Sequence, residues 1–497
     1  MLKAMLLAER AESERLRQII KELQRHRFGR RAESLPAEQL QLGLEEAEQI
    51  EAAGRAENEH AVPAERKARA ARRRANRGAL PAHLPRIETL VDVEHPVCPC
   101  CSGPLHRIGE DVAERLDIMP AQFRVLVVRR PKYACRSCED VVVQALAPAR
   151  LIEGGLPTEA TVAQVLVSKY ADHLPLYRQA QIYARQGVAL DRSTLADWVG
   201  RAAFLLRPVH GRLLDRLKGS AKLFADETTA PVLDPGRGRT KTGQLWAYAR
   251  DDRPWGGADP PGVAYVYAPD RKAERPAAHL AGFRGVLQVD GYAGYNALAA
   301  RGEVQLAFCW SHVRRPFYAL AQSGPAPIAS EALVRIAALY RIEDEIRGRP
   351  ADERRAVRQE RSRPLLEAFE PWLRGKLSLI SQKTKLADAI RYALTRWAGL
   401  CLFLEDGRIE LDSNVVERSV RPLTLNRKNA LFAGSDGGAE HWATIASLIE
   451  TCKLIGVEPH AYLADVISRI VNGHPQSRLD ELLPWAYAPD LIAKSVA

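Results

Sequence analysis

Three carboxylates in this chain lie in the kinds of local sequence that can hold metal ions. Asp226 and Asp290 each end a short apolar run, and Glu417 lies in a segment whose pattern predicts the start of an amphipathic helix. Carboxylate oxygens are ligands that Mg²⁺ and Mn²⁺ prefer. Two such ions, about 3.5–4 Å apart, stabilise the attacking and leaving oxygens when a phosphodiester is displaced in line. The three acids therefore predict phosphodiester chemistry on a nucleic acid.

The sequence around the aspartates predicts the elements that would position them. Strands are expected at 222–226, 243–250, 262–268, 285–290 and 304–308, with a helix at 274–283. This order, with an acid closing the first and the fourth strand, matches the ribonuclease-H-like fold. We therefore expect an α/β catalytic core with a mixed sheet, in which Asp226 bridges both ions while Asp290 and Glu417 each complete one.

Each acid also has a structural explanation of its own. Asp226 can cap a strand end, and Asp290, which precedes a glycine, can form a turn. Glu417 can form an exposed ion pair with Arg421, one helical turn later. The ordered set of three acids, rather than any one of them, favours a catalytic site.

The composition restricts the class of protein. The 497 residues carry a formal net charge of +11 and a pI of about 9.3. This balance is expected of a protein that binds double-stranded DNA, although ribosomal and membrane-surface proteins share it. No apolar run approaches a membrane span, and the N-terminus lacks a signal-peptide pattern. We therefore expect a cytoplasmic protein whose eight cysteines are thiols or metal ligands.

Two Cys-x-x-Cys pairs predict a zinc site. By spacing we assign the ligands to Cys98, Cys101, Cys135 and Cys138, which leaves Cys100 as a surplus thiol. Four thiolates leave no open coordination position, so the predicted Zn²⁺ is structural and belongs to a zinc-ribbon-like finger. The alternatives are buried thiols without a metal or a redox pair.

Polar and basic sequence precedes the finger. Residues 1–50 carry an apolar stripe that predicts either a short coiled coil or a helix docked on its own chain. Residues 51–92 are rich in arginine. The run that includes Arg72, Arg73 and Arg74 predicts a flexible linker that also contacts DNA phosphates.

Helical patterns flank and interrupt the predicted catalytic core. A helix at 176–183, a glycine turn and a helix at 194–203 capped by Ser193 outline a helix-turn-helix-like DNA-binding region, although any two packed helices give a similar pattern. An all-helical insertion is expected at about 325–400. The predicted domains are the N-terminal helix at 1–50, the basic linker at 51–92, the finger at 93–140, the helix-turn-helix-like region at 155–218, the catalytic domain at 219–450 and a small helical domain at 453–492.

Basic side chains surround the predicted carboxylate site in the sequence. We expect DNA contacts from His312, Arg314, Arg315, Arg418, Arg421, Arg427 and Lys428. Cys309 and His312 have metal-knuckle spacing, but no second pair follows nearby, so no zinc is predicted there. His312 is instead expected to orient DNA or the edge of the site. The alternative is a buried structural histidine.

Several segments together make the chain resemble the insertion-sequence 66 family of transposases over nearly its whole length. They are RFGRRAE at 27–33, LPAHLPR at 80–86, the two cysteine pairs, DHLPLYRQ at 172–179, ADET at 225–228, VDGY at 289–292, NVVER at 414–418, RKN at 427–429 and GS at 434–435. The resemblance implies a leucine-zipper-like N-terminal region, a zinc finger, a central Asp-Asp-Glu domain and a small C-terminal domain.

The resemblance also implies a reaction and its partners. The expected reaction is hydrolysis at the 3′ ends of a bacterial element, followed by attack of the freed 3′-hydroxyls on target DNA. Synapsis of two ends implies a homodimer or higher oligomer, and accessory proteins of the same element are expected. Two other classes remain: a nuclease or resolvase that cuts without joining, and a non-catalytic zinc-finger regulator, which would not need all three acids.

Overall fold

The computed structural model describes residues 155–488 apart from 235–238 and 301, the stretches 125–129, 131–134, 142–144 and 146–152, and the single positions 62, 64, 68 and 123. The chain divides into two compact units, 1–121 and 122–497, and the fold described below belongs to the second. The predicted N-terminal helix and most of the linker and finger lie outside the described residues. Near the finger, β1 (Lys132–Ala134) pairs antiparallel with β2 (Val142–Gln144).

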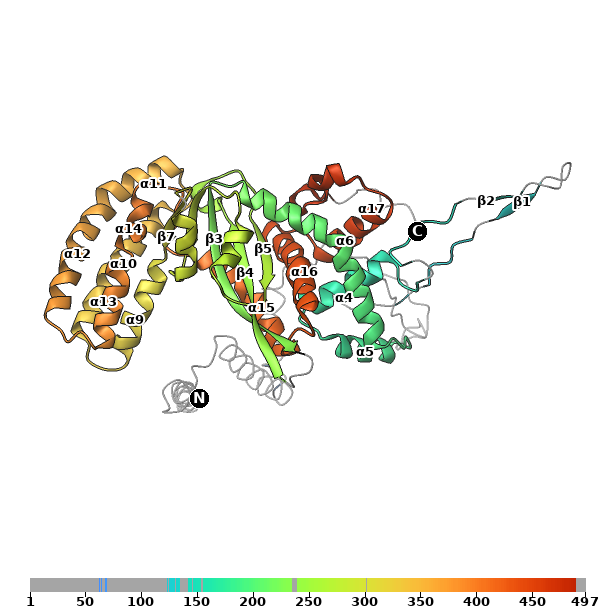
Figure 1. Cartoon of the computed structure of the whole chain (residues 1–497), viewed down its shortest axis with the longest axis horizontal. Helices are drawn as coiled ribbons and strands as arrows, with labels where there is room; N and C mark the ends of the chain where they lie inside the picture. Colours follow the sequence, from blue (N-terminus) through green and yellow to red (C-terminus); the bar gives the residue numbers. More distant parts are fainter. Residues whose placement is uncertain are drawn as a thin grey trace, which may run out of the picture. The chain divides into compact units, whose positions relative to one another are not determined.

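A five-stranded mixed sheet forms the centre of the second unit, in the order β5-β4-β3-β6-β7 (Figure 1). The strands are β3 (Lys222–Asp234), β4 (Arg239–Arg250), β5 (Gly262–Ala268), β6 (Gly285–Val289) and β7 (Val304–Phe308). β3, β4 and β5 pair antiparallel, whereas β6 joins β3, and β7 joins β6, in parallel. In β4 every residue from 243 to 250 is buried, which is typical of a strand covered on both faces.

The predicted strands are confirmed, but two of them are longer than expected: β3, and β4, which begins at Arg239 and not at residue 243. The helix expected at 274–283 ends earlier, at His279. β5 and β7 have the expected bounds. β3, in contrast, continues past Asp226 to Asp234, because its antiparallel pairing with β4 extends from Phe224 opposite Ala249 to Asp234 opposite Arg239. Asp226 therefore lies within a long strand and does not close a short one.

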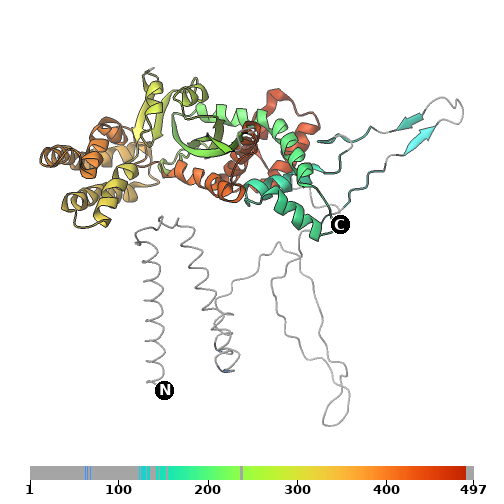
Figure 2. The same cartoon turned by 60° about the horizontal axis from the view of Figure 1, so that its bottom comes forward.

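The helices are α4 (Glu159–Tyr170), α5 (Leu176–Arg185), α6 (Arg192–Lys218), α7 (Glu274–His279), α8 (Asn296–Ala299), α9 (Trp310–Gln322), α10 (Pro327–Ile346), α11 (Ala351–Val357), α12 (Arg363–Ser378), α13 (Lys385–Leu394), α14 (Trp397–Cys401), α15 (Asn414–Ala430), α16 (Asp436–Ile455) and α17 (Pro459–Val471). In the views of Figures 1 and 2, the helices α9–α14 lie beyond the β7 edge of the sheet, and α4, α6, α16 and α17 lie toward its other end. Among the described residues, no helix combines the length and apolarity needed to cross a membrane.

The two sides of the sheet carry separate hydrophobic cores. The larger core joins the sheet to α4, α6, α16 and α17, and α16 packs on β5. The second core lies within the bundle α9–α14, which meets the sheet at β7 through α14. In this second core the Trp310 ring stacks on Phe369, with 6.3 Å between the ring centroids.

A buried group of charges ties the bundle together. The guanidinium groups of Arg354 and Arg358, whose side chains are 1% and 0% exposed, both pair with Glu343, at 3.2 and 2.6 Å. Arg354 also pairs with Glu410 at 2.8 Å, and Arg358 donates to the carbonyl of Phe403 at 2.9 Å. These contacts connect α10 and α11 to the segment that leads back toward α15.

The region 155–218 folds into three packed helices, α4, α5 and α6. In the turn after α5, Gly187 has a φ of +80°, which suits glycine. Two details of the prediction are wrong. Asp191, not Ser193, is the N-cap residue of α6, and this helix continues to Lys218 because its later turns pack on β5 and α16.

The chain that follows α15 returns to the far end of β3. The N–H of Ala433 donates to the carbonyl of Pro231 at 2.9 Å, and the N–H of Leu233 donates to the carbonyl of Ala433 at 2.8 Å. α15 itself packs against β3 and β4. This helix is therefore fixed along its length to the strand that carries Asp226.

Candidate active site

Asp226 and Asp290 lie at matching positions on neighbouring parallel strands. The register pairs Phe224 of β3 with Gln288 of β6, and each aspartate comes two residues after its member of that pair. Side chains two residues apart in a strand point to the same face. Parallel pairing therefore brings the two acids to one place in the sheet.

Glu417 lies in the first turn of α15, which packs on β3, and its charge acts on Asp226. Its carboxylate, however, groups most closely with Cys309 and His312. The pKa of Asp226 is raised to about 7, chiefly by burial, against the lowering effect of the Glu227 N–H. The negative charges of Glu227, Asp290 and Glu417 raise it as well. The three predicted carboxylates thus repel one another, and a cation among them would relieve that repulsion.

The turn explanation holds for Asp290, whereas the strand-end explanation for Asp226 is wrong, because β3 continues to Asp234. Oδ1 of Asp226 accepts a hydrogen bond from the N–H of Glu227 at 2.8 Å, and Oδ1 of Asp290 accepts one from the N–H of Tyr292 at 2.8 Å. Gly291, which lies between Asp290 and Tyr292, has a φ of +106°, a conformation that favours glycine. These bonds engage Oδ1 of each acid and orient the carboxylate, so the turn and a metal-binding role are compatible.

The helical bundle holds the turn that carries Asp290. The hydroxyl of Tyr392, on α13, donates to the carbonyl of Asp290. Arg396, just before α14, donates from Nη2 to the carbonyl of Gly291 at 3.1 Å, and its guanidinium lies 4.1 Å from the Tyr392 ring centroid. The predicted insertion therefore has a direct part in placing one of the three acids.

Glu227 is a site residue that the sequence analysis missed. Its side chain is 2% exposed, forms an ion pair with Arg271 and accepts a hydrogen bond from the Tyr295 hydroxyl at 3.0 Å. The guanidinium of Arg271 in turn lies 4.0 Å from the ring centroid of Tyr292, which follows the Asp290 turn. These contacts link Glu227 to the turn that follows Asp290. The signal of Glu227 in the sequence is its place directly after Asp226.

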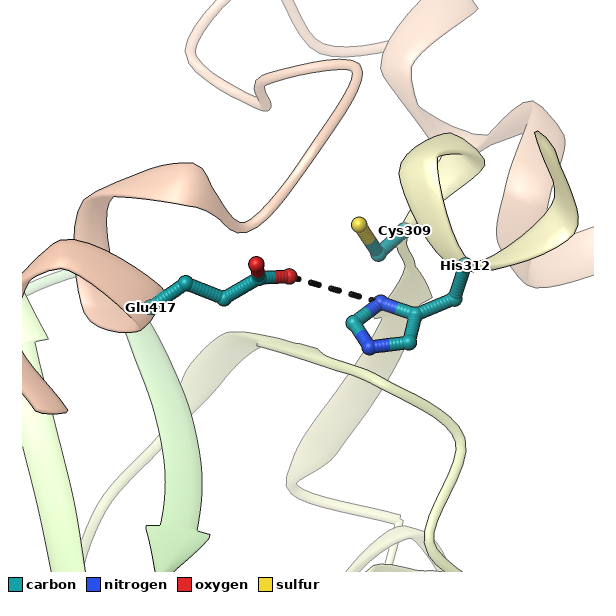
Figure 3. Close-up of side chains that lie close together, drawn as sticks. All are labelled: Cys309, His312 and Glu417. Carbon is teal, nitrogen blue, oxygen red and sulfur yellow. Dashed lines mark ion pairs between the residues drawn. The ribbon is translucent and has the colours of Figure 1, made fainter. Parts of the chain in front are cut away.

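Glu417 faces α9. Its Oε1 lies 3.7 Å from Nδ1 of His312, and its Oε2 lies 3.9 Å from Nη2 of Arg315 (Figure 3). Burial lowers the pKa of His312, an effect that the charge of Glu417 opposes. The side chain of His312 is 18% exposed and points toward this carboxylate, with its Nδ1 buried. Burial raises the pKa of the neighbouring Cys309 thiol to about 11.

Of the predicted DNA contacts, Arg314, Arg315, Arg418, Arg421 and Lys428 have exposed side chains. Exposure does not exclude a partner within the protein, since Arg315 lies 3.9 Å from Glu417. Arg427 is engaged within the protein, because its Nη1 donates to the carbonyl and the Oγ1 of Thr229, both at 2.6 Å. Arg427 therefore fastens α15 to β3. The run Arg72, Arg73 and Arg74 lies outside the described residues.

A cavity of about 680 Å³ opens beside Asp290. Its lining includes His312 and Arg315 from α9 and Lys385 and Tyr392 from α13. The lining combines two cationic side chains with two carboxylates, those of Asp290 and Asp388.

Comparison with known families decides the wider identity of the chain. Residues 154–441 match the family described as Transposase IS66 family. The chain belongs to this family. Residues 447–485 match the IS66 C-terminal element, residues 96–139 the zinc-finger binding domain of transposase IS66, and residues 15–89 the family described as Transposase C of IS166 homeodomain.

These matches confirm the resemblance to IS66 transposases along the chain. The zinc-finger match covers the four predicted zinc ligands, Cys98, Cys101, Cys135 and Cys138, all of which lie outside the described residues. The family is therefore established, whereas the individual metal ligands remain predictions from spacing.

The IS66 chain also has relatives in Sinorhizobium fredii. It is 48% identical to the uncharacterized protein y4qI over 97% of this chain and 91% of the relative. It is 48% identical to y4jD over 84% of each chain, and 40% identical to y4hP over 80% of this chain and 74% of the relative.

Proposed function

We propose that this IS66 family member is an Asp-Asp-Glu transposase that hydrolyses the 3′ strand ends of an insertion sequence and joins them to target DNA. The observation that carries the proposal is the convergence of Asp226, Asp290 and Glu417 from two parallel strands and a packed helix. The mixed sheet, in which the antiparallel strands β3, β4 and β5 are joined by the parallel strands β6 and β7, supports a ribonuclease-H-like core, and α10–α14 supply its helical insertion.

The residues present fit a pair of Mg²⁺ or Mn²⁺ ions. Carboxylate oxygens are the preferred ligands of both ions. The pKa of Asp226 is raised chiefly by burial and in addition by the neighbouring carboxylates, and bound cations would offset that repulsion. Bound divalent ions would stabilise charge on the attacking and leaving oxygens of the phosphodiester.

The chain's own residues would position the DNA for both steps. We assign Asp226 to both ions, and Asp290 and Glu417 would each help to hold one of them. Arg315 and Lys385 line the adjoining cavity and are placed to meet the DNA backbone. The exposed Arg418 and Arg421 extend this basic surface along α15.

End recognition and assembly belong to other parts of the chain. We assign sequence-dependent binding to the zinc finger and to the α5–α6 pair, and phosphate contacts to the linker arginines Arg72, Arg73 and Arg74. Joining two element ends requires at least two copies of the active site, so the proposal includes a homodimer or higher oligomer acting in the bacterial cytoplasm. Accessory proteins of the same element are further candidate partners.

The test is a cleavage and joining assay on labelled DNA that carries the ends of the parent element. Wild type, Asp226→Asn and a matched control, Asp234→Asn at the other end of β3, are compared with Mg²⁺ present. We expect metal-dependent nicking and joining by wild type and the control, and a loss of at least about 100-fold in Asp226→Asn. Nicking without joining supports a nuclease. Equal activity of Asp226→Asn rejects the site.

A further inference from the structure

Cys309, His312 and Glu417 form a compact group of potential metal ligands (Figure 3). One ligand atom from each, the thiol sulfur, a ring nitrogen and a carboxylate oxygen, lies within 4.8 Å of the other two. Within the described part of the chain, no other three residues of these types meet so closely. In the sequence, no second pair of metal ligands lies near Cys309 and His312. The fold brings a third potential ligand, Glu417 in α15, from more than 100 positions away.

The backbone holds these three side chains at the start of two helices. Cys309 is the N-cap residue of α9, and His312 lies in the first turn of that helix, so both side chains project from the same end. Glu417 projects from the first turn of α15. In Figure 3 the carboxylate and the imidazole point toward each other, with the sulfur beside the gap.

Two of the ligand atoms are buried without a hydrogen-bond partner. Nδ1 of His312 and Oε1 of Glu417 are both screened from solvent, yet the 3.7 Å between them is too long for a hydrogen bond. Buried polar atoms without partners are rare and costly. A cation between the two atoms would satisfy both.

The ligand types select a thiophilic ion. Sulfur, imidazole nitrogen and carboxylate oxygen together suit Zn²⁺, whereas Mg²⁺ takes oxygen ligands. Tetrahedral Zn²⁺ sets its ligand atoms roughly 3.3–3.6 Å apart, so the 3.7 Å separation already approaches the required spacing. The N–H of Ser413 donates to the Cys309 sulfur at 3.2 Å, a supporting contact of the kind that orients metal-bound ligands.

We propose that Cys309, His312 and Glu417 bind Zn²⁺ and that this ion inhibits DNA cleavage by withdrawing Glu417 from the catalytic metal pair. The binding part stands on the three side chains alone. The inhibitory part rests on the proposed transposase function, which assigns Glu417 to Mg²⁺. The Glu417 carboxylate then binds either the Zn²⁺ ion or a catalytic Mg²⁺ ion, and only the Mg²⁺ site supports DNA cleavage.

Binding is tested by counting zinc in the full-length chain. Wild type, Cys309→Ser, His312→Gln and the control Cys401→Ser, which alters a thiol on α14, are incubated with Zn²⁺, desalted and analysed for metal content per chain. We expect Cys309→Ser and His312→Gln to hold one zinc ion fewer than wild type and Cys401→Ser. Equal zinc in all four proteins, each verified as folded by circular dichroism, overturns the site.

Inhibition is tested by titrating Zn²⁺ into the Mg²⁺-dependent cleavage assay, with each rate expressed relative to the same protein's rate without zinc. We expect the inhibiting zinc concentration to rise about tenfold or more in Cys309→Ser and to stay unchanged in Cys401→Ser. Equal inhibition of both variants places the inhibitory ion elsewhere and rejects this part of the proposal. If wild type shows no cleavage in Mg²⁺ alone, the transposase proposal fails, whereas the zinc count still decides the binding site.

Discussion

At the residue scale, Asp226 is held where ionisation is unfavourable, although it must be ionised to bind a metal. Its pKa of about 7 lies well above the ordinary value of 3.8, chiefly because the carboxyl group is buried. The folded state therefore holds the proton more tightly than the unfolded state. The free energy of unfolding that Asp226 contributes through this proton is fully present below pH 3.8 and is lost as the pH rises through 7.

The first prediction follows from this sign. In chelator, Asp226→Asn should unfold less readily than wild type, and the difference should grow between pH 4 and pH 8. The full shift corresponds to about 4 kcal/mol, and we expect roughly 2 kcal/mol because the side chain keeps some solvent contact. Urea denaturation at several pH values measures it. A difference that is independent of pH contradicts the argument.

His279 gives a second prediction, with a different sign. Burial, with a smaller effect of the Arg275 charge, lowers its pKa from 6.5 to about 4, and its Nδ1 lies 3.0 Å from the Tyr248 hydroxyl. As the pH falls from 6.5 to 4, the unfolded chain takes up a proton that the folded chain refuses. The free energy of unfolding should therefore fall by up to about 3 kcal/mol over this window.

The variant His279→Gln removes that titrating group and should lose this part of the pH dependence. Denaturation curves of the two proteins at pH 4.5, 5.5 and 7 provide the comparison. Parallel pH profiles would show that His279 is as easily protonated in the folded protein as in the unfolded one.

The sequence predicts some site residues and not others for a physical reason. Asp226 and Asp290 can be found because residue type, apolar runs and strand order are local signals. The pairing of Glu227 with Arg271, and the approach of His312 to Glu417, depend on contacts between segments that are distant in the sequence. Such contacts follow from the packing of α9 and α15, which no local pattern contains.

At the element scale, the helical bundle depends on a buried charge cluster as well as on its apolar core. The third prediction is that Glu343→Ala destabilises the protein by about 3–5 kcal/mol, because it leaves two fully buried guanidinium groups without their shared carboxylate. Thermal unfolding followed by circular dichroism measures the loss.

The matched control is Glu331→Ala on the same helix, α10. Glu331 pairs with Arg335 at 2.9 Å in an exposed position, where such a pair contributes only about 0.5 kcal/mol. Similar losses for the two variants would mean that burial does not determine the strength of the Glu343 contacts.

The ends of a helix or strand were predictable where the apolar pattern of the sequence stops at the same residue as the contacts with neighbouring elements. β5 and β7 are examples, since a turn residue or a helix start follows each apolar run. The lengths of β3 and α6 were not predictable in this way. β3 is extended by its hairpin partner β4, and α6 by contacts with β5 and α16, so tertiary packing sets both ends.

At the scale of the whole molecule, the net charge of +11 favours binding to DNA, which is a polyanion. The fourth prediction concerns the exposed Arg418 and Arg421 on α15. If both meet phosphates, replacing both by glutamine should reduce the slope of log K against log salt concentration by about 2, since each phosphate contact contributes roughly 0.9. Binding to labelled duplex DNA at several salt concentrations gives the slope.

The control for this measurement replaces Arg335 and Arg374 by glutamine. These two arginines are paired with Glu331 and Glu370 on the bundle, so the loss of formal charge is the same. An equal change of slope in both double variants would assign the effect to overall charge and not to α15.

The path of the chain around the active site has a consequence for how this protein can vary. β3 runs onward from Asp226, α15 runs onward from Glu417, and the two meet again where Ala433 bonds to Pro231 and Leu233. The segment from Asp226 to Pro231 and the segment from Glu417 to Ala433 therefore have lengths that must match, because hydrogen bonds join their far ends. Inserting or deleting a residue in one of these two segments would move its carboxylate relative to the other carboxylate. We therefore expect that, among related proteins, a length change in one segment is accompanied by a compensating change in the other.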